Sequence, residues 1–243
     1  MNILIPMAGG GDTFKERGFA HIKSLVEIKG EPLIQHVWAN FSTLNAKKHI
    51  YVIRKEDAGQ HRLADVLKLM DPRAELVLAQ GPTHGAACTA LLAIGQIDPD
   101  EELVITNGDQ ILKTDLLNII NGFRSQNLDG GVVVFDSIHP RWSFVRLDAS
   151  GLVVEAAEKR PISRWATAGM YYFKRGGDFI RAAMAMIRKD ASVNGMFYIC
   201  PCFNEMVLNL QRIGVHAIER NAYLSLATPA DAEYYENYLS TLQ

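Results

Sequence analysis

The feature that most constrains the fold of this chain is an alternation of two hydrophobic patterns over its first 127 residues. Short apolar runs of strand length alternate with segments whose apolar residues recur at helical spacing. The runs typical of strands are NILIPM, HIYVIR, ELVLAQ and ELVITNGDQ, and those typical of helices are PLIQHVWANFSTL, QHRLADVLKLM, GAACTALLAIGQI and KTDLLNIINGFRSQ. Such alternation predicts βαβ units, and therefore an α/β fold whose sheet is mostly parallel with right-handed crossovers.

The pattern changes after about Asn127. Closely spaced runs typical of strands follow, separated by short turns such as DASG, and they predict a mixed or antiparallel extension of the same sheet. Two further helices, a late strand and a final helix with Pro229 in its first turn complete the expected elements. No repeat or linker interrupts the sequence, so we expect one domain over residues 1–243, with halves at 1–127 and 128–243.

Charge and composition exclude several classes of function. The formal net charge is −2, so no global basic field exists to hold the chain on nucleic acid or on an anionic membrane. None of its apolar stretches approaches the roughly 20 residues of a spanning helix. We therefore expect a cytoplasmic protein that binds neither nucleic acid nor membrane. The three cysteines, Cys88, Cys200 and Cys202, lack the spacing of a disulfide framework or a metal site, and we expect buried thiols.

Three consecutive glycines, Gly9 to Gly11, follow the first expected strand. The stretch matches neither the dinucleotide fingerprint G-x-G-x-x-G nor the P-loop G-x-x-x-x-G-K-[ST]. A tight turn that needs positive φ would account for the glycines alone. Bare backbone N–H groups also bind phosphate oxygens closely, because no Cβ intervenes. The glycines by themselves leave both interpretations open.

The wider pattern resembles the sugar-1-phosphate nucleotidyltransferases. Their opening signature, A-G-x-G-x-R-F followed by K-P-L and G-x-P-x-I, falls on Ala8, Gly9, Gly11, Phe14, Lys23, Leu25, Gly30, Pro32 and Ile34. Later blocks of the family fall on Gln80 and Gly85, on the strand end ITNGDQ, on Glu158 and Lys159, and on Gly169, Tyr171 and Phe173. The stretches HPRWSFVRLD and GVVVFDS also resemble a subgroup associated with bacterial capsule and surface polysaccharides.

This resemblance implies a three-layer, Rossmann-like nucleotidyltransferase fold, with a mostly parallel mixed sheet and helices on both faces. It implies transfer of a nucleotide from a nucleoside triphosphate to a sugar 1-phosphate or similar phosphate acceptor, with pyrophosphate released. Residues 1–127 would then be the nucleotide-binding half and 128–243 the acceptor-binding half. A magnesium ion as cofactor and a possible homo-oligomer follow from the same resemblance.

The resemblance also implies roles for individual residues. The nucleotide-binding residues would be Ala8, Gly9, Gly10, Gly11, Thr13, Lys23, Gln80, Gly85, Asn107 and Asp109. Glu158, Lys159 and Gly169 would bind the acceptor. The catalytic residues would be Lys23, Asp109 and Lys159, with Asp109 also holding the metal. Plainer interpretations remain open for these side chains, namely exposed lysines, a surface glutamine, a solvated Glu–Lys pair and an aspartate in a turn.

Three positions depart from the family pattern. Thr13 stands where the family usually has a triphosphate-binding Arg, Ser225 stands near the usual second metal-binding Asp, and Met196 stands in place of a Glu. Lys15 or Arg17 would be able to replace the missing charge. Otherwise the chain would be an enzyme with altered substrates or a nucleotide-binding protein with little turnover. A glycosyltransferase is a further alternative, although its usual Asp-x-Asp motif reads Asn107-Gly108-Asp109 here.

Overall fold

The fold was analysed in a computed structural model, which describes residues 1–9 and 12–242. The nucleotide-binding roles expected for Gly10 and Gly11 therefore lie outside the described residues. Within the described part of the chain, no helix is both long and apolar enough to cross a membrane.

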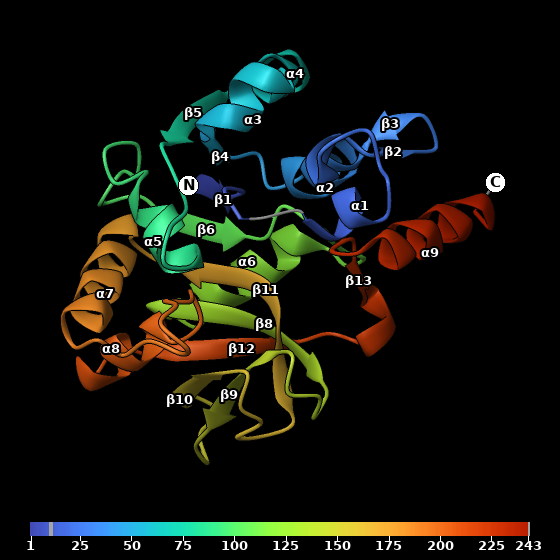
Figure 1. Ribbon diagram of the computed structural model, residues 1–243. Helices are drawn as coiled ribbons and strands as arrows, with labels where there is room; N and C mark the ends of the chain where they lie inside the picture. Colours follow the sequence, from blue (N-terminus) through green and yellow to red (C-terminus); the bar gives the residue numbers. More distant parts are fainter. Residues whose placement is uncertain (10–11, 243) are drawn as a thin grey trace.

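A mixed sheet of nine strands, counted over the described residues, forms the centre of the molecule (Figure 1). Its main path runs β10-β9-β11-β6-β1-β4-β5, and β8 pairs with β11 and with β12. The strands are β1 (Asn2–Pro6), β4 (Lys48–Arg54), β5 (Ala74–Ala79), β6 (Leu103–Thr106), β8 (Gly130–Asp136), β9 (Ser143–Leu147), β10 (Val153–Glu158), β11 (Trp165–Phe173) and β12 (Ile213–Ala217). The pairings orient all of them in one direction except β10 and β11, which confirms a mostly parallel mixed sheet.

Helices cover both faces of this sheet because successive strand residues point to opposite sides. In β1, Ile3 and Ile5 belong to one buried apolar cluster, whereas Leu4 belongs to the other. The first cluster includes residues of α2 (Leu33–Ser42), α4 (Leu63–Met70), α6 (Leu116–Ser125) and α9 (Pro229–Ser240). The second includes residues of α5 (Ala86–Leu91), α7 (Gly176–Arg188) and α8 (Cys202–Leu208), which gather on one side in Figure 1. The expected three-layer arrangement is therefore confirmed.

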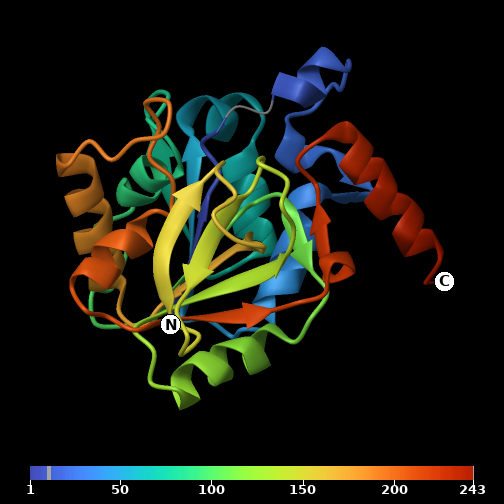
Figure 2. The ribbon, with the colours of Figure 1, turned by 90° about the horizontal axis from the view of Figure 1, so that it is seen from below.

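Two small antiparallel sheets extend from this centre. They pair β2 (Glu27–Ile28) with β3 (Glu31–Pro32), and β7 (Gln110–Leu112) with β13 (Tyr223–Ser225). Figure 2 shows the one that contains the late strand β13 beside α9. The β7–β13 pairing sets Ser225 opposite Gln110, so a late segment of the chain meets the end of β6. The remaining described elements are α1 (Asp12–Glu16), α3 (Lys55–Gln60) and two 3₁₀ turns at Lys23–Leu25 and Arg220–Ala222.

Local sequence signals explain several helix ends. Asp115 caps α6, because its side chain accepts a hydrogen bond from Asn118 N at 2.9 Å at the start of the helix. At α9, Thr228 and Asp231 form a reciprocal capping box with Pro229 in the first turn. The helix expected over QHRLADVLKLM begins only at Leu63, because Arg62 has a left-handed backbone with φ 55°.

Other boundaries also differ from the expected ones. The segment before Arg62 forms the separate helix α3, which the apolar pattern did not predict. α8 ends at Leu208, and Leu210, two residues later, has a positive φ of 58°. Cys200 and Cys202 are buried as expected, whereas Cys88 is only half-buried.

Candidate active site

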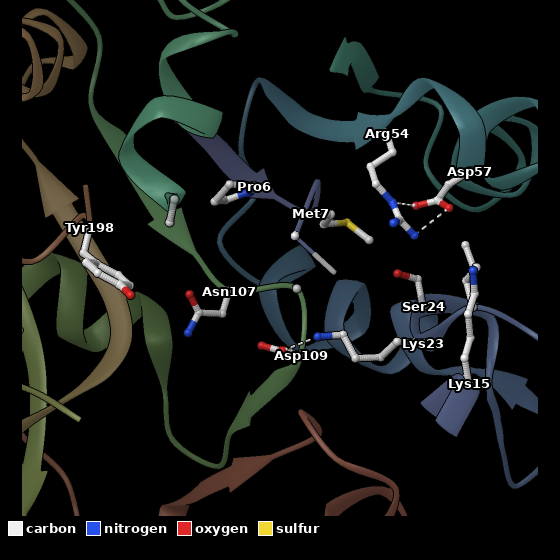
Figure 3. Close-up of a pocket in the computed structure, with 14 residues that line it drawn as sticks. Pro6, Met7, Lys15, Lys23, Ser24, Arg54, Asp57, Asn107, Asp109 and Tyr198 are labelled. Carbon is white, nitrogen blue, oxygen red and sulfur yellow. Dashed lines mark hydrogen bonds and ion pairs between the residues drawn. The ribbon is translucent and has the colours of Figure 1, made fainter. Parts of the chain in front are cut away.

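The carboxyl ends of β1, β4 and β6 meet at one edge of the sheet, where ligands of open α/β folds bind. β1 leads into Met7 and Gly9, β4 ends at Arg54, and β6 leads into Asn107 and Asp109. A cavity of about 330 Å³ opens at this edge (Figure 3). It is lined by Pro6, Met7, Gly9, Lys15, Ile22, Lys23, Ser24, Arg54, Asp57, Ala86, Asn107, Gly108, Asp109 and Tyr198. We name it the first cavity.

A second cavity of about 400 Å³ adjoins the first one. The residues that line both cavities are Ala86, Asn107, Asp109 and Tyr198. The second cavity is otherwise lined mainly by residues from the later half of the chain, among them Glu158, Gly169 and Ser225. The site is therefore two chambers that meet at Asn107 and Asp109, and in Figure 3 these two side chains lie between Tyr198 and Arg54.

Lys23 and Asp109 form an ion pair at this junction. Lys23 Nζ lies 2.5 Å from Asp109 Oδ2, and the two side chains are 24% and 23% exposed. The 3₁₀ turn at Lys23–Leu25 presents the lysine from one side, and the loop after β6 presents the aspartate from the other. Because both side chains are partly open to the cavities, a bound phosphate would have access to the ammonium group and a cation to the carboxylate.

Gly169 shapes the floor of the second cavity. It has φ +64°, and a Cβ at this position would lie 2.3 Å from both Asn107 Nδ2 and Gln110 Oε1. These two atoms are themselves joined by a hydrogen bond of 3.1 Å, and Asn107 N donates to Gly169 O at 3.3 Å. The loop that carries Asn107 and Asp109 therefore packs directly against the backbone of Gly169. This close approach is possible because glycine has no side chain.

Gly85 fixes the position of the segment that carries Tyr198. Its φ is +104°, and an added Cβ would lie 2.3 Å from Phe197 O. Phe197 N donates to His84 O at 2.7 Å, and Ala87 N donates to Phe197 O at 3.0 Å. Gly85 itself lines neither cavity among the described residues, and its contacts hold Tyr198 at the junction.

Glu158 and Lys159 occupy different positions despite being neighbours in the chain. Glu158 is buried, lines the second cavity and accepts a hydrogen bond from Ser143 Oγ, and burial raises the pKa of its carboxyl group. Lys159 is exposed and lines neither cavity, in the part of the chain that is described. Its Nζ donates to Tyr198 Oη at 3.0 Å, and this hydrogen bond raises the pKa of the lysine. Lys159 thus reaches the junction through Tyr198.

Several residues expected in the site lie outside both cavities as the structure describes them. Gln80 is exposed directly after β5, Ala8 is buried shortly after β1, and Thr13 is exposed on α1. Met196 is exposed as well, and its backbone pairs with Val193. Of the two cations that the sequence offered in place of an Arg at position 13, Lys15 lines the first cavity.

Other residues of the site were not singled out from the sequence. Arg54 lines the first cavity and donates to buried Asp57 at 2.8 and 2.9 Å through Nε and Nη2. The position of Arg54 at the end of a strand beside β1 was an available signal, because neighbouring parallel strands end at the same edge. No sequence pattern pointed to Tyr198. It reaches the junction because Phe197, the residue before it, packs against Gly85 and its neighbours.

Ser225, which stands near the position where we expected a second metal-binding Asp, lines the second cavity. Its Oγ donates to Asp231 Oδ2 at 2.9 Å, and the same carboxylate oxygen accepts from Thr228 N at 3.1 Å. Asp231 is thus in the first turn of α9, and it also lines the second cavity.

Asp109 is the side chain at the junction that offers a carboxylate to a magnesium ion. The described residues hold no group of three or more His, Cys, Asp or Glu side chains able to bind a metal. Mg²⁺ commonly takes one or two carboxylates and completes its octahedron with phosphate oxygens and water. A single carboxylate, Asp109, beside a cavity open to a phosphate ligand fits that mode of binding.

Comparisons with known proteins agree with this geometry. The chain is 27% identical over 178 residues to the bifunctional protein GlmU of Methanocaldococcus jannaschii, a match that covers 72% of this chain and spans 40% of that relative's length. A nucleoside-diphosphate-sugar pyrophosphorylase from Vibrio cholerae RC9 superposes with a TM-score of 0.84, at 24% identity, over 97% of this chain and 99% of its own.

A second solved structure has the same fold. It is a Bacillus anthracis protein assigned as a glucose-1-phosphate thymidylyltransferase and solved in complex with sucrose, with a TM-score of 0.74, 17% identity, and coverage of 98% of this chain and 94% of its own. The family model named Nucleotidyl transferase matches residues 7–196, which is well over half of the chain and includes the junction residues. The chain therefore belongs to the nucleotidyl transferase family.

Proposed function

We propose that this protein joins a nucleoside triphosphate to a sugar 1-phosphate, or to a similar phosphate acceptor, and releases pyrophosphate. The observation that carries this proposal is the pair of adjoining cavities that share Asn107 and Asp109, with Lys23 paired to Asp109 at 2.5 Å. One chamber would hold the nucleotide and the other the acceptor, so that the two phosphates meet beside Lys23. Membership of the nucleotidyl transferase family supports the same reaction.

The proposed reaction needs no nucleophile from the protein. An oxygen of the acceptor phosphate attacks the α-phosphorus of the triphosphate, and the bond from that phosphorus to the oxygen bridging to the β-phosphate breaks. Pyrophosphate then carries away the electron pair. Catalysis of this kind depends on alignment and on neutralising charge, which suits an ammonium group at the meeting point of the two cavities.

Lys23 and Lys159 would act on charge, and Glu158 on the acceptor. Lys23 would neutralise phosphate charge at the junction, and Lys159 would reach the acceptor phosphate beside Tyr198. Glu158, set in the wall of the second cavity, would bind acceptor hydroxyls. A magnesium ion held by Asp109 would supply further charge neutralisation on the phosphates.

We further propose that the product serves the synthesis of bacterial surface polysaccharide, such as capsule or lipopolysaccharide, in the cytoplasm. The support for this assignment is the sequence resemblance of HPRWSFVRLD and GVVVFDS to that subgroup. A homo-oligomer is part of the same proposal, and light scattering on the purified protein tests it. We propose that neither nucleic acid nor membrane is a partner, in keeping with the net charge of −2.

A catalytically weak nucleotide-binding protein is the second candidate function. Two observations favour it: Thr13 is exposed outside the first cavity, and Ser225 offers a hydroxyl where a second carboxylate would bind metal. A glycosyltransferase is less well supported, because Asn107 stands in place of the first acid of its metal motif and its amide is bonded to Gln110.

The test is a thermal-shift screen of the four common nucleoside triphosphates with Mg²⁺, followed by pyrophosphate release with sugar 1-phosphates. We expect release with at least one pair, and a loss of about 100-fold or more in Lys23→Ala and Asp109→Asn. Lys68→Ala, an exposed change on α4, is the matched control and should keep full activity. Nucleotide stabilisation without release from any pair would support the binding protein instead. Transfer from an activated sugar nucleotide would support a glycosyltransferase.

A further inference from the structure

A third cavity, of about 430 Å³, continues from the second one away from the junction. The residues shared by the second and third cavities are Arg141, Tyr223, Ser225 and Asp231. The third cavity is lined in addition by Glu219, Arg220, Asn221, Leu224 and Tyr234. An acceptor that fills the second cavity from Asp109 outward would therefore end at this third space.

Two arginines converge on this space from separate parts of the chain. Arg141 belongs to the connection between β8 and β9, and its guanidinium carbon lies 4.3 Å from the ring centre of Trp142. Arg220 belongs to the 3₁₀ turn before β13, and its guanidinium carbon lies 4.9 Å from the ring centre of Phe135 and 5.5 Å from that of Tyr223.

The three aromatic rings form one packed group. Phe135 and Tyr223 are stacked at 5.2 Å between centroids, and Trp142 contacts each of them edge-on at 5.3 Å. A guanidinium held against aromatic faces keeps its plane fixed and leaves its N–H edges directed away from the rings. Such edges bind carboxylate and phosphate oxygens, with two parallel hydrogen bonds when the geometry allows.

The charges around the two arginines leave room for an anion. Neither guanidinium lies within 4.0 Å of a carboxylate oxygen among the described residues, and Arg220 Nη1 donates to Tyr223 O at 3.2 Å. The acids that line this cavity are Glu219 and Asp231. Asp231 already accepts hydrogen bonds from Ser225 of β13 and from Thr228, the N-cap of α9, so its charge is partly satisfied.

We propose that the acceptor carries a second anionic group, at the end remote from its reacting phosphate, and that Arg141 and Arg220 bind this group. The proposal rests on the proposed function, because it assigns the second cavity to the acceptor. The substrate class is thus a sugar phosphate with an additional carboxylate or phosphate. Both a carboxylate and a phosphate present a compact group of negatively charged oxygens to the two arginines, and the experiment below distinguishes between them.

The experiment compares three acceptors built on the same sugar ring: a hexose 1-phosphate, the corresponding uronic acid 1-phosphate and the hexose 1,6-bisphosphate. Binding is measured by titration calorimetry and turnover by pyrophosphate release, in the wild-type protein and in Arg141→Ala, Arg220→Ala and Arg146→Ala. Arg146 is the matched control, since it is an exposed arginine on β9 that is paired with Glu155 at 2.7 Å and lines none of the three cavities as described.

We expect the wild type to bind one of the two acceptors that carry a second anionic group at least tenfold more tightly than the hexose 1-phosphate, whose only charged group is its phosphate. Arg141→Ala and Arg220→Ala should each remove most of that preference and leave nucleotide binding unchanged, and Arg146→Ala should keep it. Preference for the uronic acid identifies a carboxylate, and preference for the bisphosphate identifies a phosphate. Equal binding of all three acceptors, binding of none, or a preference that survives both substitutions would overturn the proposal.

The two readouts separate this inference from the reaction itself. Arginine-dependent binding of an acceptor with two anionic groups, without pyrophosphate release, supports the subsite and contradicts the transferase. Release of pyrophosphate with the hexose 1-phosphate, at a rate that Arg141→Ala and Arg220→Ala leave unchanged and with no preference for a second anionic group, supports the transferase and contradicts the subsite.

Discussion

At the residue scale, Thr13 stands where the sequence resemblance led us to expect an arginine. Thr13 is exposed outside the first cavity, whereas Lys15, two residues later on α1, lines that cavity. Lys23 lines the same cavity from the 3₁₀ turn. Two ammonium groups therefore face the space proposed for the triphosphate, and they provide positive charge that threonine lacks.

Lys15→Ala should weaken nucleoside triphosphate binding by roughly tenfold, since a charge-assisted hydrogen bond contributes about 1.5–3 kcal/mol. Arg17→Ala is the matched control, because Arg17 is an exposed cation of the same region that does not line the cavity as described. Calorimetric titration with the best nucleotide measures both variants. Equal losses in the two, or a loss only in Arg17→Ala, would show that Lys15 does not replace the arginine.

Glu158 gives the site a dependence of stability on pH. Burial raises the pKa of this carboxyl above its ordinary value of 4.5, so the folded protein holds the proton more tightly than the unfolded chain. Its contribution is favourable below pH 4.5 and is lost as pH rises through the folded-state value. Glu158→Gln should therefore have the higher melting temperature near pH 7, with the difference shrinking toward pH 4. A difference that is constant across this range, or of opposite sign at pH 7, would contradict the assignment.

At the scale of single elements, β11 is the strand that determines the shape of the site. Its register shifts between Thr167 and Tyr171 in the pairing with β8, and Gly169 lies inside this irregularity with φ +64°. The bulge bends the strand and lets the loop after β6 approach it closely. The junction between the first two cavities thus depends on one strand having no side chain at one position.

Gly169→Ala should destabilise the protein by more than about 1–2 kcal/mol, the cost of a left-handed backbone alone, because its Cβ would also overlap Asn107 and Gln110. Gly122→Ala is the matched control. Gly122 lies within α6 with no atom within 4 Å of an added Cβ, so this change should stabilise by about 0.5–1 kcal/mol. Urea denaturation measures both. A neutral Gly169→Ala would mean that the loop moves freely.

The elements also show how far the sequence alone predicts this structure. The alternation of periods predicted the sheet and its two helical layers, because both depend on local apolar spacing. The same spacing did not show that Arg62 divides α3 from α4, nor that β13 pairs with β7, since the first depends on one backbone angle and the second on a long-range contact.

The site residues show the same contrast between what local sequence patterns predict and what depends on tertiary contacts. Lys23 and Asp109 were predicted from motif positions, and the structure pairs them. Asp57 and Tyr198 were missed because they reach the first cavity through tertiary packing, and Arg54 because its place at a strand end was not used. The roles assigned to all of the site residues stay predictions, and those of Gln80 and Lys159 concern side chains that lie outside both cavities of the described structure.

At the scale of the whole molecule, the two halves expected from the sequence contribute to one sheet and to one site. The boundary at residues 127 and 128 falls between α6 and β8, and the strands of both halves pair across β6 and β11. The first cavity is lined mainly from the early half and the second mainly from the later half. In the proposed reaction, nucleotide and acceptor would occupy these adjoining cavities and meet at Asp109.

The most direct test of this account follows the α-phosphate itself. A nucleoside triphosphate labelled at its α-phosphorus is incubated with Mg²⁺, a sugar phosphate acceptor and the wild-type protein, and the products are separated. We predict that label appears in a nucleoside diphosphate sugar in equal amount to the pyrophosphate released, and that Asp109→Asn abolishes both. Label that stays in the triphosphate, or that appears as free nucleoside mono- or diphosphate whether or not an acceptor is present, would contradict the proposed transfer.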